Sequence, residues 1–353
     1  MSIYDEMKME MRLVLIMYNR NFKDLINRIK PIATLVIIIL LVIAVIVMSI
    51  LLAKSEGKSV QTVAQVEETT VTVPVYEEPD FELLFNTDDS AKVFFHDSTF
   101  GEVWIPLLKD VPLSPYKDEN YKTENGLKYY YEDNELKSVA GIDVSVHQKD
   151  INWKKVKASG IDFAMIRVGF TGYQTGESFL DSNYKKNIQG ALDAGLDVGV
   201  YFFSQAINVD EAIKEAELML DAIKDYKITY PVVYDWEIIY DDEARTDEMS
   251  VNMLTNTTIA FCETVKSAGY TPMIYSSRKQ TYLKLDLSRL TDYDFWLAEF
   301  NPTTSYRYNY QMWQYSCTGQ VDGIEGDVDL NISFVDYGER YRKAHGEEDT
   351  EDN

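Results

Sequence analysis

Short apolar runs recur at regular intervals along the C-terminal part of the chain. They are rich in β-branched and aromatic residues and have the length of buried strands. The runs cover residues 141–146, 163–170, 198–204, 231–237, 272–277, 295–300, 311–316 and 328–332. Because helical or turn-rich segments separate them, the pattern predicts a sheet of eight strands.

Apolar residues at helical spacing predict helices between the earlier strands. These helices cover residues 184–194, 210–226 and 246–268. In the second, Ile213, Ala216, Leu220 and Ile223 recur on one face, and Gly269 follows the third as a C-cap would. The connections become short after the fifth strand. The alternation predicts an α/β fold, an irregular (β/α) barrel of eight strands with helix-poor last strands.

A long apolar segment lies near the N-terminus. Residues 32–53 contain no charged side chain and are dominated by Ile, Leu and Val, which is long enough for a helix to span a bilayer. A cleaved signal peptide is the alternative, but this run is too long and begins after residue 31. Lys and Arg are more frequent before the segment than after it. The positive-inside bias therefore predicts a cytoplasmic N-terminus and an extracellular remainder.

The segment between this apolar run and the barrel consists of two parts that differ in composition. Its first part is rich in Glu, Thr and Val and is typical of a stalk. Its second part contains short strands, and the last of them, residues 127–131, is expected to pair across Asp133-Asn134 with residues 136–140. This part forms either a small β module or an ordered extension of the stalk. The predicted parts are a cytoplasmic segment (1–30), a transmembrane helix (31–53), an acidic stalk (54–84), a small β-rich segment (85–140), the barrel (141–338) and an acidic tail (339–353).

Composition excludes several classes of function. A formal net charge of −24 makes nucleic acid a poor partner. Two cysteines, Cys262 and Cys317, exclude a disulfide scaffold and a cysteine-rich zinc site, although one disulfide or two free thiols both remain open. The three histidines lack metal-ligand spacing, so we expect neither a metal nor a cofactor.

Four carboxylates interrupt the otherwise apolar strands, where an ionised group is costly unless it is paired or used. They are Asp143 on the first strand, Asp235 and Glu237 on the fourth, and Asp329 on the eighth. Asp235 and Glu237 lie two residues apart, so they point to one face and repel, which raises at least one pKa. A carboxyl that stays protonated near neutral pH suits a general acid for glycosidic cleavage. The alternative is an ion pair with Arg167.

Aromatic side chains also fall on or near the ends of the strands. Flat rings stack well on the C–H faces of sugars, so these residues suit a saccharide groove, whereas packing of the barrel is the alternative for about half of them. They are Tyr201, Tyr234, Tyr275, Trp296, Trp313 and Tyr315.

Taken together, these residues resemble glycoside hydrolase family 25, the muramidases of the Chalaropsis type. The resemblance covers residues 141–334 and rests on the order and spacing of short motifs. The motifs are Gly141-Ile142-Asp143-Val144-Ser145, Arg167, Val200-Tyr201-Phe202, Tyr234-Asp235-Trp236-Glu237, Ile274-Tyr275, Trp296-Leu297-Ala298, Trp313-Gln314-Tyr315-Ser316 and Val328-Asp329-Leu330-Asn331.

The resemblance implies cleavage of the β-1,4 bond between N-acetylmuramic acid and N-acetylglucosamine in peptidoglycan. It implies that Glu237 is the general acid, and that Asp235 orients the 2-acetamido group or stabilises positive charge at the anomeric carbon. Asp143 and Asp329 would hold the sugar and tune those two pKa values. Glu299 is an additional acid without an assigned role. The positions implied to bind substrate are Arg167, Tyr201, Tyr275, Trp296, Trp313 and Gln314.

The sequence therefore predicts a muramidase tethered to the outer face of the cytoplasmic membrane, with peptidoglycan glycan strands as its partner. The alternative is a non-catalytic wall-binding module, which would bind glycan without releasing reducing ends. A scaffold of a membrane complex is a third function, with partners docked on residues 85–140 or on the cytoplasmic segment.

Overall fold

The computed structural model describes residues 92–97 and 101–347. The predicted cytoplasmic segment, transmembrane helix and stalk lie outside these residues. Among the helices that the structure does describe, none has both the length and the apolar character needed to cross a membrane.

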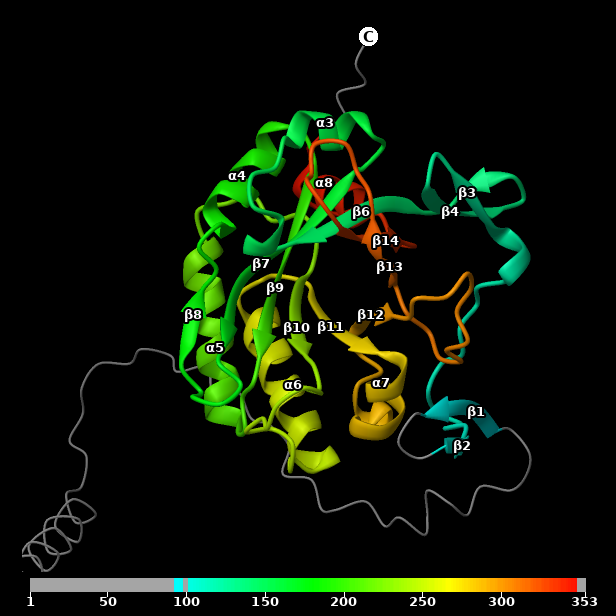
Figure 1. The fold of residues 1–353 in the computed structure, drawn as a ribbon, viewed down its shortest axis with the longest axis vertical. Helices are drawn as coiled ribbons and strands as arrows, with labels where there is room; N and C mark the ends of the chain where they lie inside the picture. The colour runs from blue at the N-terminus through cyan, green and yellow to red at the C-terminus, as the bar shows by residue number, and fades with distance from the viewer. Residues whose placement is uncertain (1–91, 98–100, 348–353) are drawn as a thin grey trace, which may run out of the picture. The chain divides into compact units, whose positions relative to one another are not determined.

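Eight strands close into a barrel, which confirms the predicted architecture (Figure 1). They run parallel from β6 to β13, and β14 completes the ring between β13 and β6. The short β8 (Ser178–Leu180) pairs with β7 outside the ring. The barrel strands are β6 (Val139–Val144), β7 (Phe163–Thr171), β9 (Asp197–Ser204), β10 (Val232–Trp236), β11 (Pro272–Ser277), β12 (Asp294–Ala298), β13 (Met312–Gly319) and β14 (Val328–Ser333).

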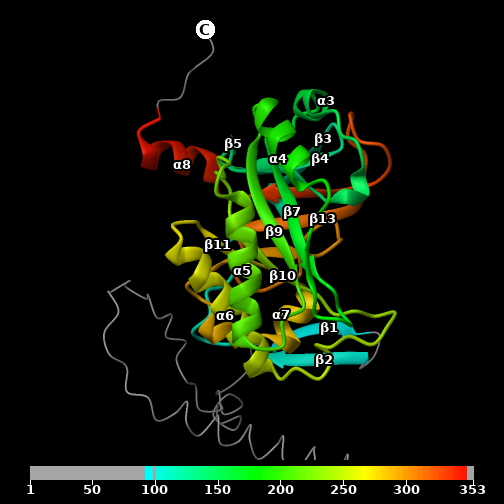
Figure 2. The ribbon, with the colours of Figure 1, turned by 90° about the vertical axis from the view of Figure 1, so that its left-hand side faces the viewer.

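Helices cover the outside of the earlier strands, as Figures 1 and 2 show for α4, α5 and α6. Side-chain caps fix where two of them begin, because Asn208 accepts from the Glu211 N–H and Ser250 from the Met253 N–H. The helices are α3 (Trp153–Ala158), α4 (Tyr184–Asp193), α5 (Val209–Ile223), α6 (Val251–Ser267), α7 (Arg278–Lys284) and α8 (Tyr337–His345).

The last helix, α8, includes the first residues of the predicted acidic tail. The predicted acidic tail begins at residue 339, but α8 continues through His345. Tyr337 is buried at the start of this helix, and Arg342 forms an ion pair with Asp197 of β9. These contacts hold the first residues of the predicted tail against the barrel.

The direction of β14 differs from the other barrel strands. It runs antiparallel to both β13 and β6 because the connection from β13 is a short hairpin, whereas a parallel return needs a long crossover. Asp329 is the second residue of β14 and pairs in register with Asp143, which is near the C-terminal end of β6. In barrels of parallel strands, active residues gather at the C-terminal ends of the strands. Strand β14 instead brings its N-terminal end to the edge where β6 ends.

The segment before the barrel forms two small antiparallel units. The hairpin β1 (Lys92–Asp97) and β2 (Gly101–Pro106) comes first, followed by the sheet of β3 (Tyr121–Glu124), β4 (Leu127–Glu132) and β5 (Glu135–Leu136). The predicted turn at Asp133-Asn134 joins β4 to β5, and both residues have positive φ, as a tight hairpin turn requires. The strand predicted for residues 136–140 is instead divided between β5 and β6.

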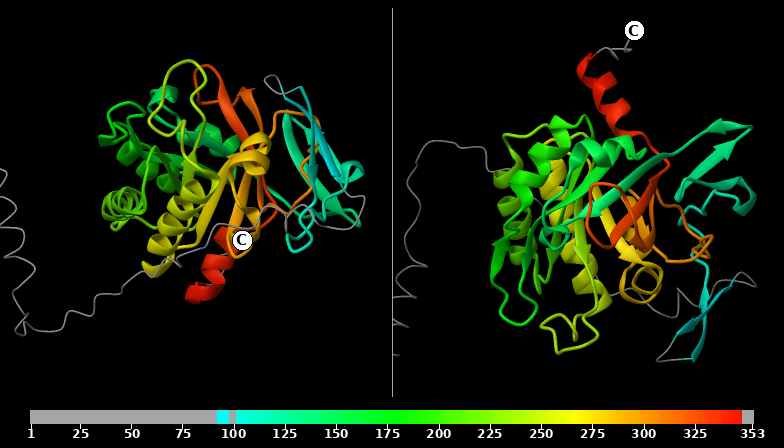
Figure 3. Two further views of the ribbon diagram at one scale, coloured as in Figure 1. Left: turned by 90° about the horizontal axis from the view of Figure 1, so that it is seen from below. Right: turned by 45° about the horizontal axis from the view of Figure 1, so that its top comes forward.

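Aromatic packing joins this second unit to the barrel. Tyr130 is buried against Tyr116 and Phe334, and Tyr116 stacks on Phe334 with ring centroids 3.7 Å apart. Tyr116 Oη also donates to the Tyr310 carbonyl at 2.9 Å. Figure 3 shows this segment beside the orange C-terminal strands. Val111, Leu127 and Tyr130 therefore belong to the buried apolar cluster on the outside of the barrel strands.

The barrel interior has an apolar floor. Its residues belong to one buried cluster, which consists of Phe163, Met165, Tyr230, Val233, Met273, Trp296, Met312 and Tyr337. Gly141 makes room for this floor, because a Cβ at that position would lie 2.3 Å from Phe163 Cζ. Phe163 in turn stacks on Tyr230 at 4.4 Å. The side chains above this floor are therefore shielded from water on their lower side.

We predict that Gly141→Ala destabilises the barrel by about 1–3 kcal/mol, because the added methyl group overpacks the floor. Thermal or urea unfolding of the full chain measures the change. The double variant with Phe163→Leu should lose less stability than the sum of the two single variants, since the smaller side chain removes the clash. Additive losses would show that Phe163 does not impose glycine at this position.

Candidate active site

Four carboxyl groups from three strands lie at one edge of the barrel. Asp143 on β6 pairs in register with Asp329 on β14, and Asp235 is the penultimate residue of β10. Glu237 follows β10 directly. Asp143 and Asp235 are only 5% and 4% exposed, whereas Glu237 and Asp329 are half-buried. Two acids therefore lie inside the barrel and two at its mouth.

A chain of hydrogen bonds fixes the orientation of Asp143. Gln314 Nε2 and Asn331 Nδ2 both donate to Asp143 Oδ2 at 2.8 Å. Tyr275 Oη donates to Gln314 Oε1 at 2.8 Å, and Trp296 Nε1 donates to Asn331 Oδ1 at 2.9 Å. Since an indole N–H can only donate, Asn331 must turn its amide nitrogen to the carboxyl. Gln314 also turns its amide nitrogen to Asp143, and its oxygen accepts from the Tyr275 hydroxyl.

Asp143 and Asp329 interact directly. Burial first, and then the Asp329 carboxylate, raise the pKa of Asp143 well above its usual value. Burial also raises the pKa of Asp329, while a hydrogen bond with Asp143 opposes the rise. A proton shared between two close carboxyls relieves their repulsion, so the pair keeps a proton to higher pH than an isolated aspartate would.

Burial also raises the pKa values of Asp235 and Glu237. For Glu237, burial and then the Asp329 carboxylate raise the pKa to about 7. For Asp235, burial and then Glu237 and Asp143 raise the pKa well above its usual value, and Arg167 opposes this. The Asp235 Oδ1 atom is buried and has no hydrogen-bond partner among the described residues. A buried carboxyl oxygen without a partner is unusual and favours a functional over a purely structural role.

Arg167 pairs with Asp181. It does not form the ion pair with Asp235 or Glu237 that the alternative to a functional site required. Its Nε and Nη2 atoms both lie 2.9 Å from Asp181 Oδ2. Asp181 is buried and also accepts from the backbone N–H groups of Val146 and Asn183. Asp181 therefore links Arg167 of β7 to the segment that follows β6. Arg167 acts on Asp235 only through its charge.

Three of the predicted aromatic residues lie next to the acids. Trp296 packs edge-on against Tyr275 and Tyr201, with centroids 4.8 and 6.1 Å away. Trp296 is buried, whereas the two tyrosines are half-buried. Burial raises the pKa values of both tyrosines, so their hydroxyls stay protonated. Tyr201 and Tyr275 can therefore contact a ligand, and Trp296 supports them from below.

Trp313 lies apart from this group. It has no exposed surface, and its Nε1 atom donates to the Glu299 carbonyl at 2.8 Å. It belongs to the core outside the barrel, with Tyr121 in a T-shaped contact and the Lys128 ammonium 4.9 Å from its ring centroid. The structure therefore brings Gln314, but not its neighbour Trp313, to the acids.

The structure answers two questions that the sequence left open, namely the role of Glu299 and the state of the two cysteines. Glu299 is buried, forms an ion pair with Arg278, and accepts from the Ser305 N–H and hydroxyl, so it holds the loop after β12. Cys262 is buried and Cys317 is exposed, and both are free thiols. The part of the chain that the structure describes contains no group of His, Cys, Asp and Glu side chains suited to a metal ion.

Sequence reasoning missed two residues of the site. Asn331, which orients Asp143, belonged to a recognised motif but was not assigned a role, although a buried amide two residues after Asp329 on the same strand face is a usable signal. Asp181 lies in a loop without periodic pattern, and its partner Arg167 could not be inferred from spacing.

Several known proteins are similar to this chain. An uncharacterized protein, YegX, of Escherichia coli strain K12 is 29% identical over 203 residues, which cover 55% of this chain and 69% of YegX. The autolytic lysozyme of Clostridium acetobutylicum is 26% identical over 193 residues and covers 54% of each chain. The modular autolysin LytC from Streptococcus pneumoniae shares the fold, with a TM-score of 0.50 and 22% identity over 70% of this chain and 57% of that chain. This chain thus spans between 54% and 69% of the length of these three proteins.

The family comparison covers most of the barrel. The profile of glycosyl hydrolases family 25 matches residues 142–324, just over half of the 353-residue chain. The matched residues include Asp143, Asp235 and Glu237, and they end before β14, so that Asp329 lies outside them. The chain therefore belongs to glycosyl hydrolases family 25 and is a glycosidase.

Proposed function

We propose that this glycosidase is an N-acetylmuramidase that cleaves the β-1,4 bond between N-acetylmuramic acid and N-acetylglucosamine in peptidoglycan. The observation that carries the proposal is the half-buried Glu237 at the mouth of the barrel, whose pKa is raised to about 7. A carboxyl of this kind is protonated in a large fraction of molecules near neutral pH and can donate its proton to a leaving oxygen. Curated relatives named autolytic lysozyme and Lysozyme M1 support the choice of substrate.

The four acids have different roles in the proposed hydrolysis. Glu237 gives its proton to the glycosidic oxygen as the bond to the anomeric carbon breaks, and a water molecule supplies the hydroxyl group that this carbon gains. The proton that water releases restores Glu237. Asp235, with its unpartnered Oδ1, orients the 2-acetamido group or stabilises the positive charge at the anomeric carbon. Asp143 and Asp329 hold the sugar and tune the two pKa values.

The pH dependence follows from the direction of the Glu237 shift. Its pKa is higher than that of an exposed glutamate, so the protonated form is present at and below pH 7 and disappears as the pH rises through about 7. The proton donor is therefore lost on the alkaline side, which should form the alkaline limb of the pH profile.

We further propose that the enzyme is anchored in the cytoplasmic membrane with its barrel outside the cell. The support is the uncharged apolar run of residues 32–53 and the excess of Lys and Arg before it. Anchoring would restrict cleavage to peptidoglycan close to the membrane, where growth, division or passage of a secretion machine requires local opening of the wall.

Glu237→Gln should lower the release of reducing ends from peptidoglycan by about 100- to 10,000-fold, because the amide cannot donate the proton. The assay compares the purified full chain with this variant and with Glu243→Gln, whose side chain is exposed in the loop after β10. The fragments from the parent should end in reducing N-acetylmuramic acid. Glycan binding without any release by the parent chain would instead indicate a wall-binding module.

Replacing Leu41 and Val45 together by aspartate should release the protein from the membrane fraction, because a charge at the centre of a spanning helix costs about 2.5–3.5 kcal/mol. The matched control replaces both residues by alanine. In intact spheroplasts, external protease should degrade the barrel of the parent chain. Recovery of the parent in the soluble fraction, or a barrel protected from external protease, would contradict the proposed topology.

A further inference from the structure

The backbone that carries Glu237 extends beyond the regular sheet. The register of β10 with β11 ends at Asp235 and that with β9 at Trp236. The backbone carbonyl of Glu237 therefore lies past the paired part of the sheet. It accepts instead from a side chain, because Gln205 Nε2 lies 3.3 Å from the Glu237 oxygen. Gln205 is itself buried and follows β9 directly.

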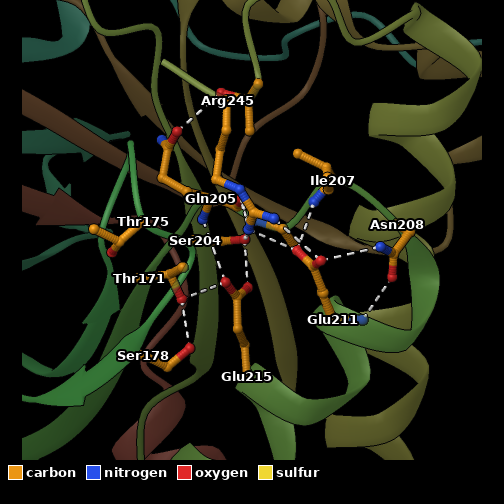
Figure 4. Close-up of polar contacts among 12 residues, drawn as sticks. Thr171, Thr175, Ser178, Ser204, Gln205, Ile207, Asn208, Glu211, Glu215 and Arg245 are labelled. Carbon is orange, nitrogen blue, oxygen red and sulfur yellow. Dashed lines mark hydrogen bonds and ion pairs between the residues drawn. The ribbon is translucent and has the colours of Figure 1, made fainter. Parts of the chain in front are cut away.

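The other polar groups of Gln205 also have partners, and Figure 4 shows Gln205 between Glu215 and Arg245. Its side-chain Oε1 accepts from the Thr246 hydroxyl at 2.9 Å, its backbone N–H donates to Glu215, and its backbone carbonyl accepts from Arg245 Nη1 at 3.2 Å. Since the Glu237 carbonyl can only accept, the amide nitrogen must face it, and Oε1 then accepts from the Thr246 hydroxyl. The orientation of this amide is therefore determined by its surroundings.

Two acids of α5 complete this arrangement. Glu215 is buried and accepts hydrogen bonds from the hydroxyls of Thr171 on β7 and Ser204 on β9 (Figure 4). Glu211 binds both terminal nitrogens of Arg245, at 2.7 and 3.1 Å. The arrangement thus connects two strands, a helix and the loop after β10. Buried polar groups that satisfy one another in this way fix a single geometry.

We propose that Gln205 is a positioning residue for Glu237: its amide holds the backbone carbonyl of Glu237, and Glu215, Arg245 and Thr246 hold Gln205 in the required orientation. This inference rests on the proposed role of Glu237 as the acid. Gln205 does not touch the reacting atoms. Its effect is to keep the Glu237 carboxyl at the barrel mouth, in the environment that raises its pKa.

A merely structural role for Gln205 predicts a different result from a positioning role. If Gln205 only stabilised the fold, its loss would lower the melting temperature and leave the turnover of folded enzyme unchanged. If it positions Glu237, turnover falls while substrate binding changes little, since a small misplacement of a catalytic group is costly to the reaction. The freed carboxyl also becomes more exposed, so its pKa falls and the alkaline limb of the pH profile moves to lower pH.

The test replaces Gln205 by methionine, which has a similar shape but no amide, in the full chain. We expect kcat on peptidoglycan to fall by about 10- to 100-fold, with KM within about threefold of the parent value and the alkaline limb at lower pH. The matched control is Gln311→Met. It removes a glutamine that accepts from the Phe295 N–H at the opposite end of the barrel, and it should change neither kcat nor the limb.

Thr246→Val provides a second variant, because it leaves Gln205 in place but removes the hydroxyl that orients the amide. It should show the same shift of the alkaline limb with a smaller loss of kcat, and it decides the question if Gln205→Met does not fold. A folded Gln205→Met or Thr246→Val enzyme with the kcat and the limb of the parent would overturn the inference alone. Full activity of Glu237→Gln would overturn the proposed acid, and this inference with it.

Discussion

Burial of carboxyl groups above an apolar floor is the constraint on which the rest of the site depends. Asp143 and Asp235 are enclosed by the barrel, and Glu237 and Asp329 lie at its mouth. Ionising all four would place like charges together in a poorly solvated space, so their pKa values rise. The raised pKa of Glu237 is the property that a general acid needs near neutral pH.

The surrounding structure keeps these costly groups in defined positions. The antiparallel β14 brings Asp329 to the same edge as Asp143, and Asn331 on the same strand donates to Asp143. Tyr275 and Trp296 bind the amide oxygens of Gln314 and Asn331, so both amide nitrogens donate to Asp143. On the other side of the barrel, Gln205 binds the backbone at Glu237. Hydrogen bonds of this kind position the acids without supplying a neutralising cation.

The fold was largely predictable because each barrel strand is a continuous apolar run, and the acids were identified because they interrupt such runs. The direction of β14 was not predicted, because an apolar run does not show whether its strand is parallel or antiparallel to its neighbours. Only the short connection before β14 suggests a reversal. The period of two along a strand also places the consecutive residues Trp313 and Gln314 on opposite faces, so both could not belong to the site. The pairing of Arg167 with Asp181 depends on a loop without periodic pattern.

The ionisation of Glu237 is the most direct test of this account. Glutamate labelled with ¹³C at the side-chain carboxyl, with the Glu237 signal identified by its loss in Glu237→Gln, can be titrated by NMR in the full chain. We predict a midpoint near pH 7 that falls in Asp329→Asn, because removal of that negative charge makes ionised Glu237 less costly. A midpoint near the ordinary value of 4.5, unchanged in Asp329→Asn, would contradict the claim that the barrel holds Glu237 as a protonated acid.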